Sequence, residues 1–116
     1  RDSGWLQFYA GTVQDVLDLY LAGIRISEHP DVLTPSMICQ DGFFLSHSMQ
    51  KVDVPEDSAT FGFVGQYRRQ NMYLDPEDPI FVNDLTPTDD YGEMRYQQMV
   101  GFRNAAAVAE EVFAEF

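Results

Sequence analysis

The order of apolar patterns in residues 5 to 40 constrains the fold more than any other feature of this 116-residue chain. The segment WLQFYA, residues 5–10, is too short for a helix and ends at Gly11, so we expect a strand there. Residues 12–28 follow the spacing of an apolar helical stripe, made by Val13, Val16, Leu17, Tyr20, Leu21 and Ile24. Residues 35–40 form a second apolar run, which predicts a second strand.

A strand, a helix and a strand of these lengths predict a right-handed crossover with two parallel strands in one sheet, and therefore an α/β fold. Pro30 should end the helix near His29, because proline disfavours helical geometry in the residue before it. The pair Asp41 and Gly42 suits a turn. The loop QDGFFLSHS, residues 40–48, is thus expected at the carboxyl end of a parallel strand, where such sheets bind ligands.

The rest of the chain divides into an irregular and a helical part. Residues 55–87 have no apolar period and gather proline, aspartate and glycine, which predicts an irregular segment on the surface. A helical period returns from about Asp90 and predicts a terminal helix over residues 90–116. Its apolar stripe comprises Met94, Gln98, Phe102, Ala105, Val108, Ala109, Val112 and Phe116.

Composition excludes several classes of function. Nineteen acidic and seven basic residues give a net charge of −12, which repels nucleic acid and anionic lipid. Cys39 is the only cysteine, so an internal disulfide and a thiolate cage for a metal are excluded, and a reducing cytoplasm fits best. No apolar run approaches the length of a membrane span.

Two interpretations of the loop at residues 40–48 remain open. In the structural one, Asp41 and Ser46 hydrogen-bond the backbone of the loop, while Phe43, Phe44 and Leu45 fill a core or an interface. In the functional one, the same polar side chains border a ligand site at the end of the strand.

The sequence gives little support to a catalytic triad, a metal site or a phosphoacceptor site in this loop. A triad of Ser46, His47 and Asp41 is disfavoured, because adjacent serine and histidine side chains are expected to point apart and no G-x-S-x-G elbow is present. His29 and His47 stand alone, which argues against a metal site. A receiver-like domain with Asp41 as phosphoacceptor would need an acidic pair near the first strand and a lysine on a later strand, and neither is visible.

Four segments carry a resemblance to a known family. RDSGWLQFYAGTVQDVLDL, MICQDGFFLSHSMQKVDVP, LDPEDP and DDYGEMRYQQ resemble, in order, the alpha subunit of the 2-oxoacid:ferredoxin oxidoreductases of the pyruvate synthase type. The most specific parts are the R-x-S/T-G-W/F start, the V-Q-D/E helix start and the D-G-F-x-x-S-H loop. The resemblance implies a partial domain over residues 1–116, the second half of the domain that binds the pyrimidine ring of thiamine diphosphate.

The resemblance also implies a reaction, which belongs to the whole enzyme. Such enzymes decarboxylate a 2-oxoacid on thiamine diphosphate with Mg²⁺, pass electrons through four-iron, four-sulfur clusters to ferredoxin, and transfer the acyl group to coenzyme A. Pyruvate is the commonest substrate, while 2-oxoglutarate, branched-chain, aryl and oxalate variants share the framework. The rival interpretation is a structural or interaction module that needs partner domains to close its sheet.

The resemblance also implies roles for individual residues. It assigns Arg1 to the substrate carboxylate, because a guanidinium donates two parallel hydrogen bonds to such a group. It places the following at the rim of the active site, at a domain interface: Ser3, Gly4, Asp41, Gly42, Phe43, Ser46 and His47. The groups that grip both ends of the cofactor are expected on other domains or subunits, so we expect this chain alone to hold no cofactor and to be inactive.

Overall fold

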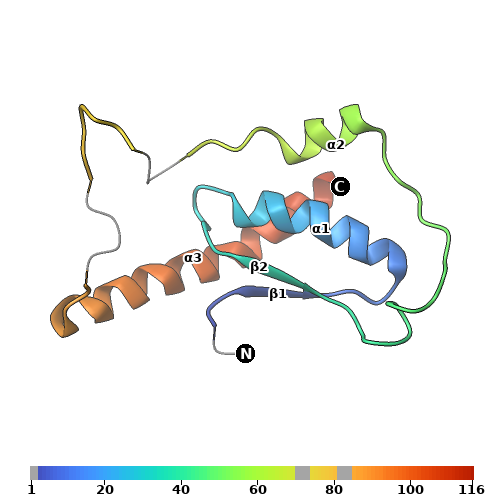
Figure 1. Ribbon diagram of the computed structural model, residues 1–116, viewed down its shortest axis with the longest axis horizontal. Coiled ribbons are helices and arrows are strands. Elements are labelled where there is room, and N and C mark those ends of the chain that lie inside the picture. Colours follow the sequence, from blue (N-terminus) through green and yellow to red (C-terminus); the bar gives the residue numbers. More distant parts are fainter. Residues whose placement is uncertain (1–2, 70–73, 81–84) are drawn as a thin grey trace.

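A computed structural model of the chain describes residues 3–69, 74–80 and 85–116 (Figure 1). The elements in chain order are β1 (Leu6–Tyr9), α1 (Val13–Ser27), β2 (Ser36–Cys39), α2 (Asp57–Val64) and α3 (Thr88–Glu115). Helix α1 packs against the strands, and both α2 and α3 pack against α1. The fold is thus α/β with a long carboxy-terminal helix, as predicted.

Strands β1 and β2 pair in parallel, which confirms the predicted parallel pairing. Leu6 lies opposite Ser36, and Tyr9 lies opposite Cys39. The backbone N–H of Leu6 donates to the carbonyl oxygen of Pro35, and that of Ala10 donates to the oxygen of Cys39, both at 2.9 Å. The loop that begins at residue 40 therefore leaves the carboxyl end of a parallel strand.

Helix α1 begins at a capping box that fixes its direction. The Oγ1 of Thr12 accepts a hydrogen bond from the N–H of Asp15 at 3.1 Å, and the Oδ2 of Asp15 accepts one from the N–H of Thr12 at 2.9 Å. The Asp15 carboxylate also accepts the N–H of Gly11 at 3.0 Å. At the other end α1 stops at Ser27, close to the predicted end before Pro30.

The buried face of α1 is not the predicted apolar stripe. That stripe is half-buried or exposed, and Tyr20 is 60% exposed, whereas Ala22, Gly23 and Ile26 are buried. A Cβ added to Gly23 would lie 3.1 Å from the Cδ1 of Ile38, so the helix approaches the sheet very closely. The apolar spacing predicted the helix correctly, but it did not show that the face with Ala22, Gly23 and Ile26 is the most buried one.

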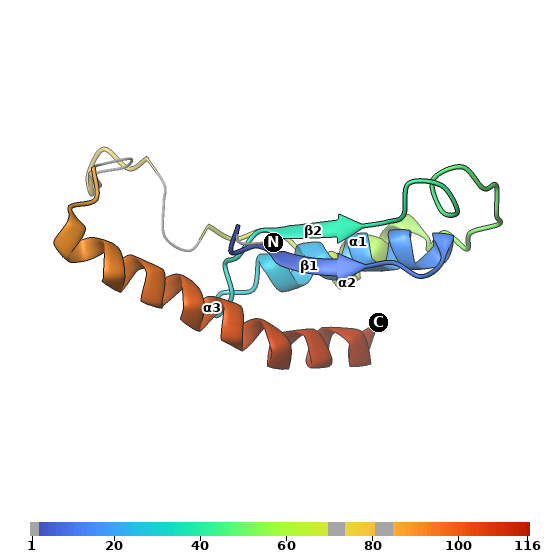
Figure 2. The same cartoon turned by 90° about the horizontal axis from the view of Figure 1, so that it is seen from below.

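The core lies between β1, α1 and the second half of α3. Its buried apolar residues are Leu6, Ala22, Ile26, Val32, Ala105, Val108 and Val112. The last three belong to the stripe predicted for α3, but its ends at Met94 and Phe116 are 54% and 51% exposed. Figure 2 shows why for the first of them: the first turns of α3 extend well beyond the strands. Within the described ranges, no helix combines the length and apolar character needed to cross a bilayer.

The segment 55–87 contains a helix that the sequence did not predict. Helix α2 packs on α1, where the guanidinium of Arg25 lies 4.8 Å from the centre of the Phe63 ring. The prediction of an irregular segment was wrong for Asp57–Val64, because eight residues are too few for an apolar period to stand out. The other described residues of the segment form neither helix nor strand.

The close contact of α3 with the connection between α1 and β2 can be tested at Gly101. A Cβ at this position would clash with the carbonyl oxygen of Val32. We expect Gly101→Ala to lower the free energy of unfolding by about 1–3 kcal/mol, because a backbone atom must move. Gly92→Ala in the same helix is the control, since a Cβ there meets nothing within 4 Å. The control should be neutral, or stabilising by up to about 1 kcal/mol. Thermal unfolding followed by circular dichroism measures both, and equal changes would contradict the contact.

Candidate functional site

The loop after β2 is shaped by the carboxylate of Asp41. Its Oδ1 accepts hydrogen bonds from the N–H groups of Phe43 at 2.9 Å and Leu45 at 2.8 Å. One turn later, the carbonyl oxygen of Phe43 accepts the N–H of His47 at 3.1 Å. Asp41 therefore hydrogen-bonds the backbone of its own loop, as the structural interpretation of the sequence predicted.

The same hydrogen bonds lower the pKa of Asp41. The N–H of Leu45 is the largest cause and that of Phe43 the next, because each favours the charged form of the carboxyl group. The side chain is otherwise exposed. Asp41 is thus an ionised acceptor at neutral pH, which suits a structural or electrostatic role and not that of a general acid.

Ser46 and His47 form a polar pair in this loop. The Oγ of Ser46 lies 2.8 Å from the Nδ1 of His47, so the expectation that these neighbours point apart was wrong. The turn closed between His47 and Phe43 brings them together. The pair lacks the order of a triad, in which an acid holds the imidazole, because the Oδ1 of Asp41 bonds to backbone N–H groups instead.

The aromatic side chains of the loop do not enter the core. The Phe43 ring stacks on the imidazole of His47 with centroids 5.6 Å apart, and Phe44 meets Phe43 edge-on at 6.1 Å. Phe43 is 71% exposed and Phe44 77% exposed. Phe43 and Phe44 are therefore not part of the core that the described residues form.

Gln14 of α1 hydrogen-bonds to Asp53, in the segment between the loop after β2 and α2. Its Oε1 accepts the N–H of Asp53 at 2.8 Å, and its Nε2 donates to the carbonyl oxygen of Asp53 at 3.1 Å. The Nε2 also donates to the Oδ1 of Asp18 at 2.8 Å, which orients the amide. The Gln14 side chain thus hydrogen-bonds both the N–H and the carbonyl oxygen of Asp53, as the backbone of a neighbouring strand would. Sequence reasoning marked V-Q-D only as a helix start, since this contact joins residues far apart in the chain.

Ser3 and Gly4 lie at the opposite end of the sheet, just before β1. The Oγ of Ser3 accepts the N–H of Trp5 at 3.3 Å. Gly4 has φ 78°, a value that favours glycine, and a Cβ there would lie 2.5 Å from the Nε2 of Gln98. Arg1 lies outside the described residues. Because the strands are parallel, the structure separates Ser3 and Gly4 from the loop after β2 and does not bring the two groups together (Figure 2).

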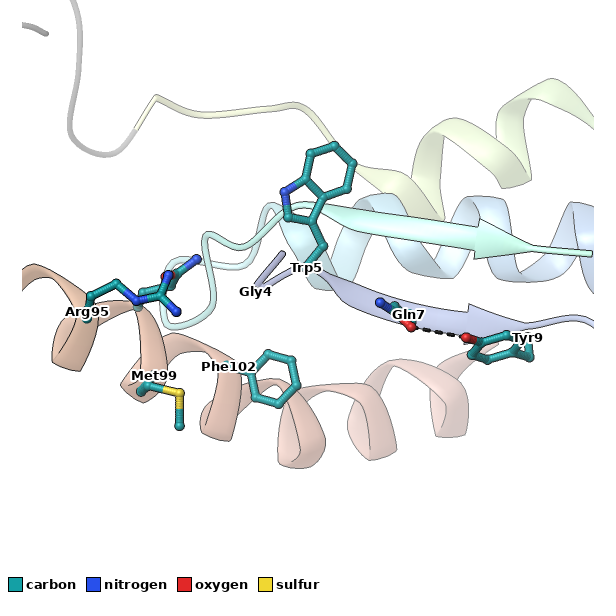
Figure 3. Close-up of a pocket in the computed structure, with 8 residues that line it drawn as sticks. Gly4, Trp5, Gln7, Tyr9, Arg95, Met99 and Phe102 are labelled. Carbon is teal, nitrogen blue, oxygen red and sulfur yellow. Dashed lines mark hydrogen bonds between the residues drawn. The ribbon is translucent and has the colours of Figure 1, made fainter. Parts of the chain in front are cut away.

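A groove of about 600 Å³ runs along β1 beside α3 (Figure 3). The Oη of Tyr9 donates to the Oε1 of Gln7 at 3.0 Å on one side, and the Nη1 of Arg95 donates to the Oε1 of Gln98 on the other. The lining comprises Gly4, Trp5, Gln7, Tyr9, Arg95, Gln98, Met99 and Phe102. Aromatic rings with a few amides are typical of surfaces that receive an apolar partner.

Sequence reasoning missed this groove although part of its signal was present. Trp5, Gln7 and Tyr9 alternate along the predicted strand, which places them on one of its sides. Phe102 belongs to the stripe predicted for the terminal helix. No local pattern shows that these two sets meet, because the helix and the strand are far apart in the sequence.

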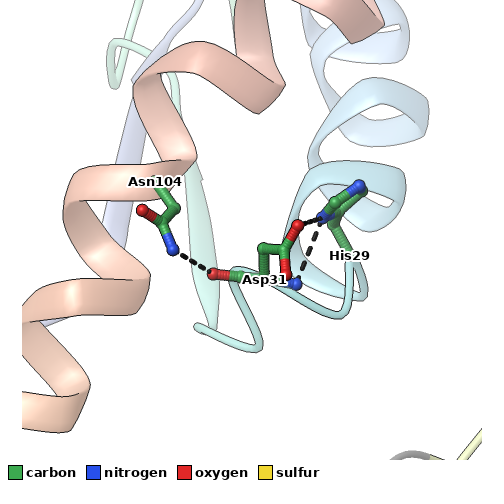
Figure 4. A network of polar contacts seen from close by, with 3 residues as sticks. All are labelled: His29, Asp31 and Asn104. Carbon is green, nitrogen blue, oxygen red and sulfur yellow. Dashed lines mark hydrogen bonds and ion pairs between the residues drawn. The ribbon is translucent and has the colours of Figure 1, made fainter.

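His29 belongs to a small cluster of polar contacts with Asp31 and Asn104 (Figure 4). Its Nδ1 accepts the N–H of Asp31 at 3.2 Å, and the Nδ2 of Asn104 donates to the carbonyl oxygen of Asp31 at 2.9 Å. While the Nδ1 accepts this amide hydrogen, its lone pair is not available to a metal. Across the described part of the chain, no three His, Cys, Asp or Glu side chains stand close enough to hold a metal ion.

Comparison with known proteins identifies similar chains. Residues 1–114 match the family described as pyruvate flavodoxin/ferredoxin oxidoreductase, thiamine diphosphate-binding. The chain is 40% identical over 116 residues to pyruvate synthase subunit PorA of Pyrococcus abyssi, and 39% identical to the subunit of that name from Methanothermobacter thermautotrophicus. It is 37% identical over 123 residues to the alpha subunit of an NADH-dependent phenylglyoxylate dehydrogenase from Aromatoleum evansii. Each match covers 100% of this chain but only 29% or 30% of the relative.

The lowered pKa of Asp41 predicts how the loop responds to acid. Since the pKa in the fold lies below the ordinary 3.8, the stabilisation by the charged form is complete above 3.8 and is lost as the pH falls through the lower value. The amide signals of Phe43 and Leu45 in NMR spectra should follow this titration with a midpoint below 3.8. Asp41→Asn keeps an acceptor oxygen and should abolish the titration while the loop stays folded. A midpoint at 3.8 or above would contradict the hydrogen bonds to the carboxylate.

Proposed function

The chain belongs to the family of pyruvate flavodoxin/ferredoxin oxidoreductase thiamine-diphosphate-binding domains, and from this premise we propose that it is part of a 2-oxoacid:ferredoxin oxidoreductase. The match over residues 1–114 carries the proposal. The identity of 40% to a pyruvate synthase subunit supports it, and so does the D-G-F-x-x-S-H loop held by Asp41 after β2.

We place residues 1–116 in the second half of the domain that binds the pyrimidine ring of the cofactor. The small sheet supports this assignment, because the described residues form two parallel strands, whereas sheets most often have about four to six. The comparisons support it as well, since the chain spans less than a third of the relatives it matches. On this view the chain is an incomplete unit that other parts of the enzyme complete.

The proposed reaction is that of the whole enzyme. A 2-oxoacid, coenzyme A and two oxidised ferredoxins give acyl-coenzyme A, CO₂, a proton and two reduced ferredoxins. We take pyruvate as the substrate, because the pyruvate synthase subunits are among the most similar chains. The phenylglyoxylate dehydrogenase subunit at 37% identity makes an aryl 2-oxoacid the alternative. The single cysteine supports a reducing cytoplasm as the location of the complex.

Thiamine diphosphate would supply the carbanion-stabilising chemistry of this reaction when bound. The described residues of this chain do not fit its diphosphate end, because they offer no carboxylate cluster for Mg²⁺ and the Oδ1 of Asp41 already serves two N–H groups. We therefore assign the metal, the diphosphate and the iron–sulfur clusters to other parts of the enzyme, and we derive no step on the cofactor from this chain.

We assign the loop after β2 to a domain interface beside the active site. The hydrogen bonds of Asp41 and the Ser46–His47 pair fix its shape, with Gly42 in the turn. Phe43 and Phe44 are exposed and would pack on the neighbouring domain. Ser3 and Gly4 border the other end of the strands, so their place at the rim, with Arg1 next to them in sequence, is a separate assignment that needs its own test.

A structural or interaction module is the second candidate function, and the exposed aromatic side chains of the loop favour it. The two functions are compatible, because a half-domain can complete an active site without holding the cofactor. No feature of the described residues favours the phosphoacceptor alternative: Lys51, the single lysine of the sequence, pairs with Asp53 at 3.4 Å.

The reaction is tested with the complete enzyme that contains this chain. Ferredoxin reduction is measured with coenzyme A and, in turn, pyruvate, 2-oxoglutarate, a branched-chain 2-oxoacid and phenylglyoxylate. We expect the highest kcat/KM with pyruvate, and loss of activity after removal of thiamine diphosphate and Mg²⁺, restored when both are returned. Activity with none of these acids would refute the proposal, while a preference for phenylglyoxylate would replace pyruvate as the substrate.

The assignment of Arg1 to the substrate carboxylate has a sharper test. Arg1→Lys keeps the charge but loses the bidentate contact, and such a charge-assisted hydrogen bond contributes about 1.5–3 kcal/mol. In the complete enzyme kcat/KM for the 2-oxoacid should therefore fall by about 10- to 150-fold, with normal cofactor content. Arg68→Lys, at an exposed arginine, is the matched control. Unchanged kcat/KM in both variants would remove Arg1 from the site.

A further inference from the structure

Residues 41–52, which contain most of the loop after β2, make few contacts with the body of the fold. Across the part of the chain that the structure describes, each hydrogen bond of these residues joins two members of the same segment. Among residues 41–51 only Leu45 is half-buried, and the others are exposed. The segment thus keeps its own shape, but its internal bonds do not fix where it lies relative to α1 and the sheet.

Two anchors join this segment to the fold. Before it, the N–H of Ala10 donates to the carbonyl oxygen of Cys39, the last residue of β2, at 2.9 Å. After it, the Gln14 side chain bonds to Asp53 through the N–H at 2.8 Å and the carbonyl oxygen at 3.1 Å. Asp53 belongs to no helix or strand, so the side chain of Gln14 takes the place of a backbone partner. Both anchors lie at the end of the sheet where α1 begins (Figure 1).

Apolar packing between the segment and α1 is incomplete. A hollow of about 420 Å³ is lined by Val13 and Val16 of α1 and by Val52 and Val54 of the chain that follows the loop. Val54 is 74% exposed. Because loosely packed side chains leave the distance between two segments free, the two bonds of Gln14 are the contacts that fix it.

The amide of Gln14 is oriented by its own helix. Gln14 lies in the first turn of α1, and its Nε2 donates to the Oδ1 of Asp18, one turn further along, at 2.8 Å. A carboxylate only accepts hydrogen bonds, so this contact turns the amine toward Asp18 and leaves the Oε1 for the N–H of Asp53. Only a side chain that carries a donor and an acceptor on one group can bond both backbone groups of Asp53 in this way.

We propose that Gln14 is a positioning residue: by clamping Asp53, it sets where the loop after β2 meets the neighbouring domain. This proposal rests on the proposed function, in which that loop lies at a domain interface beside the active site. Gln14 is assigned no contact with substrate or cofactor and acts through the loop alone. Displacements of about 1 Å in the parts around a reacting centre are enough to slow a reaction strongly, so release of the clamp should lower the rate of turnover.

Hydrogen exchange in the complete enzyme tests the clamp before any substitution. The N–H of Asp53 lies outside the helices and strands, but its bond to Gln14 should slow its exchange at least about tenfold relative to an unprotected amide. Exchange of this amide at the unprotected rate would overturn the proposal.

Gln14→Met then shows what the clamp holds. Methionine has a similar length and helix propensity, but it has no N–H donor and only a weak acceptor. We expect the variant to accelerate exchange of the Asp53 amide at least about tenfold, while the amide of Ala10, which bonds to β2, keeps its rate. Gln97→Met, at an exposed position of α3, is the matched control and should change neither amide. An unchanged Asp53 amide would deny the clamp, and equal acceleration of both amides would show a general loss of stability; either result overturns the proposal.

Turnover distinguishes positioning from mere stabilisation. In the complete enzyme we expect Gln14→Met to lower kcat for ferredoxin reduction by about 5- to 50-fold. The KM for the 2-oxoacid should change less than about twofold, because the loop does not hold the substrate carboxylate. An unchanged kcat, or a raised KM alone, in a variant whose Asp53 amide is released would overturn the positioning role and leave the proposed function intact. Inactivity of the unsubstituted enzyme with every 2-oxoacid would refute the proposed function, while exchange of the Asp53 amide would still decide the clamp.

Discussion

The close packing of α1 on the two strands is the contact on which the rest of the structure depends. Ala22 and Ile26 have no exposed surface, and Gly23 lies so near Ile38 that a methyl group would crowd it. Each of the other helices and strands contacts α1. Because apolar burial is the main favourable term in folding, this face positions β1 and β2. With them it places the loop after β2 and the groove beside β1.

Weaker contacts hold α2 and the end of α3 against α1, and many apolar side chains remain exposed. Arg25 joins α1 to the end of α3 through an ion pair with Glu115, but the two side chains are 29% and 58% exposed, and such pairs contribute little. Phe63 adds a ring contact with Phe116 at 5.0 Å. Tyr20 of α1 and several residues in the first half of α3, among them Tyr91 and Met94, present large side chains to solvent.

Much of the fold could be predicted because its signals are local. The capping box of Thr12 and Asp15 and the proline at position 30 set the ends of α1 within a few residues. The hydrogen bonds of Asp41 were predictable in kind, since aspartate before glycine commonly bonds to the backbone just ahead. The pairing of Ser46 with His47 was not, because it depends on how tightly the loop turns.

The sequence by itself determined the order and direction of the strands and helices, the family, and the loop that Asp41 shapes. Only the tertiary structure decided which face of α1 is buried, because apolar spacing does not show which side of the helix its neighbours cover. It also decided the partners of Gln14 and the groove between β1 and α3. These features join segments far apart in the chain, and the relative position of such segments is set by packing, which no local pattern encodes.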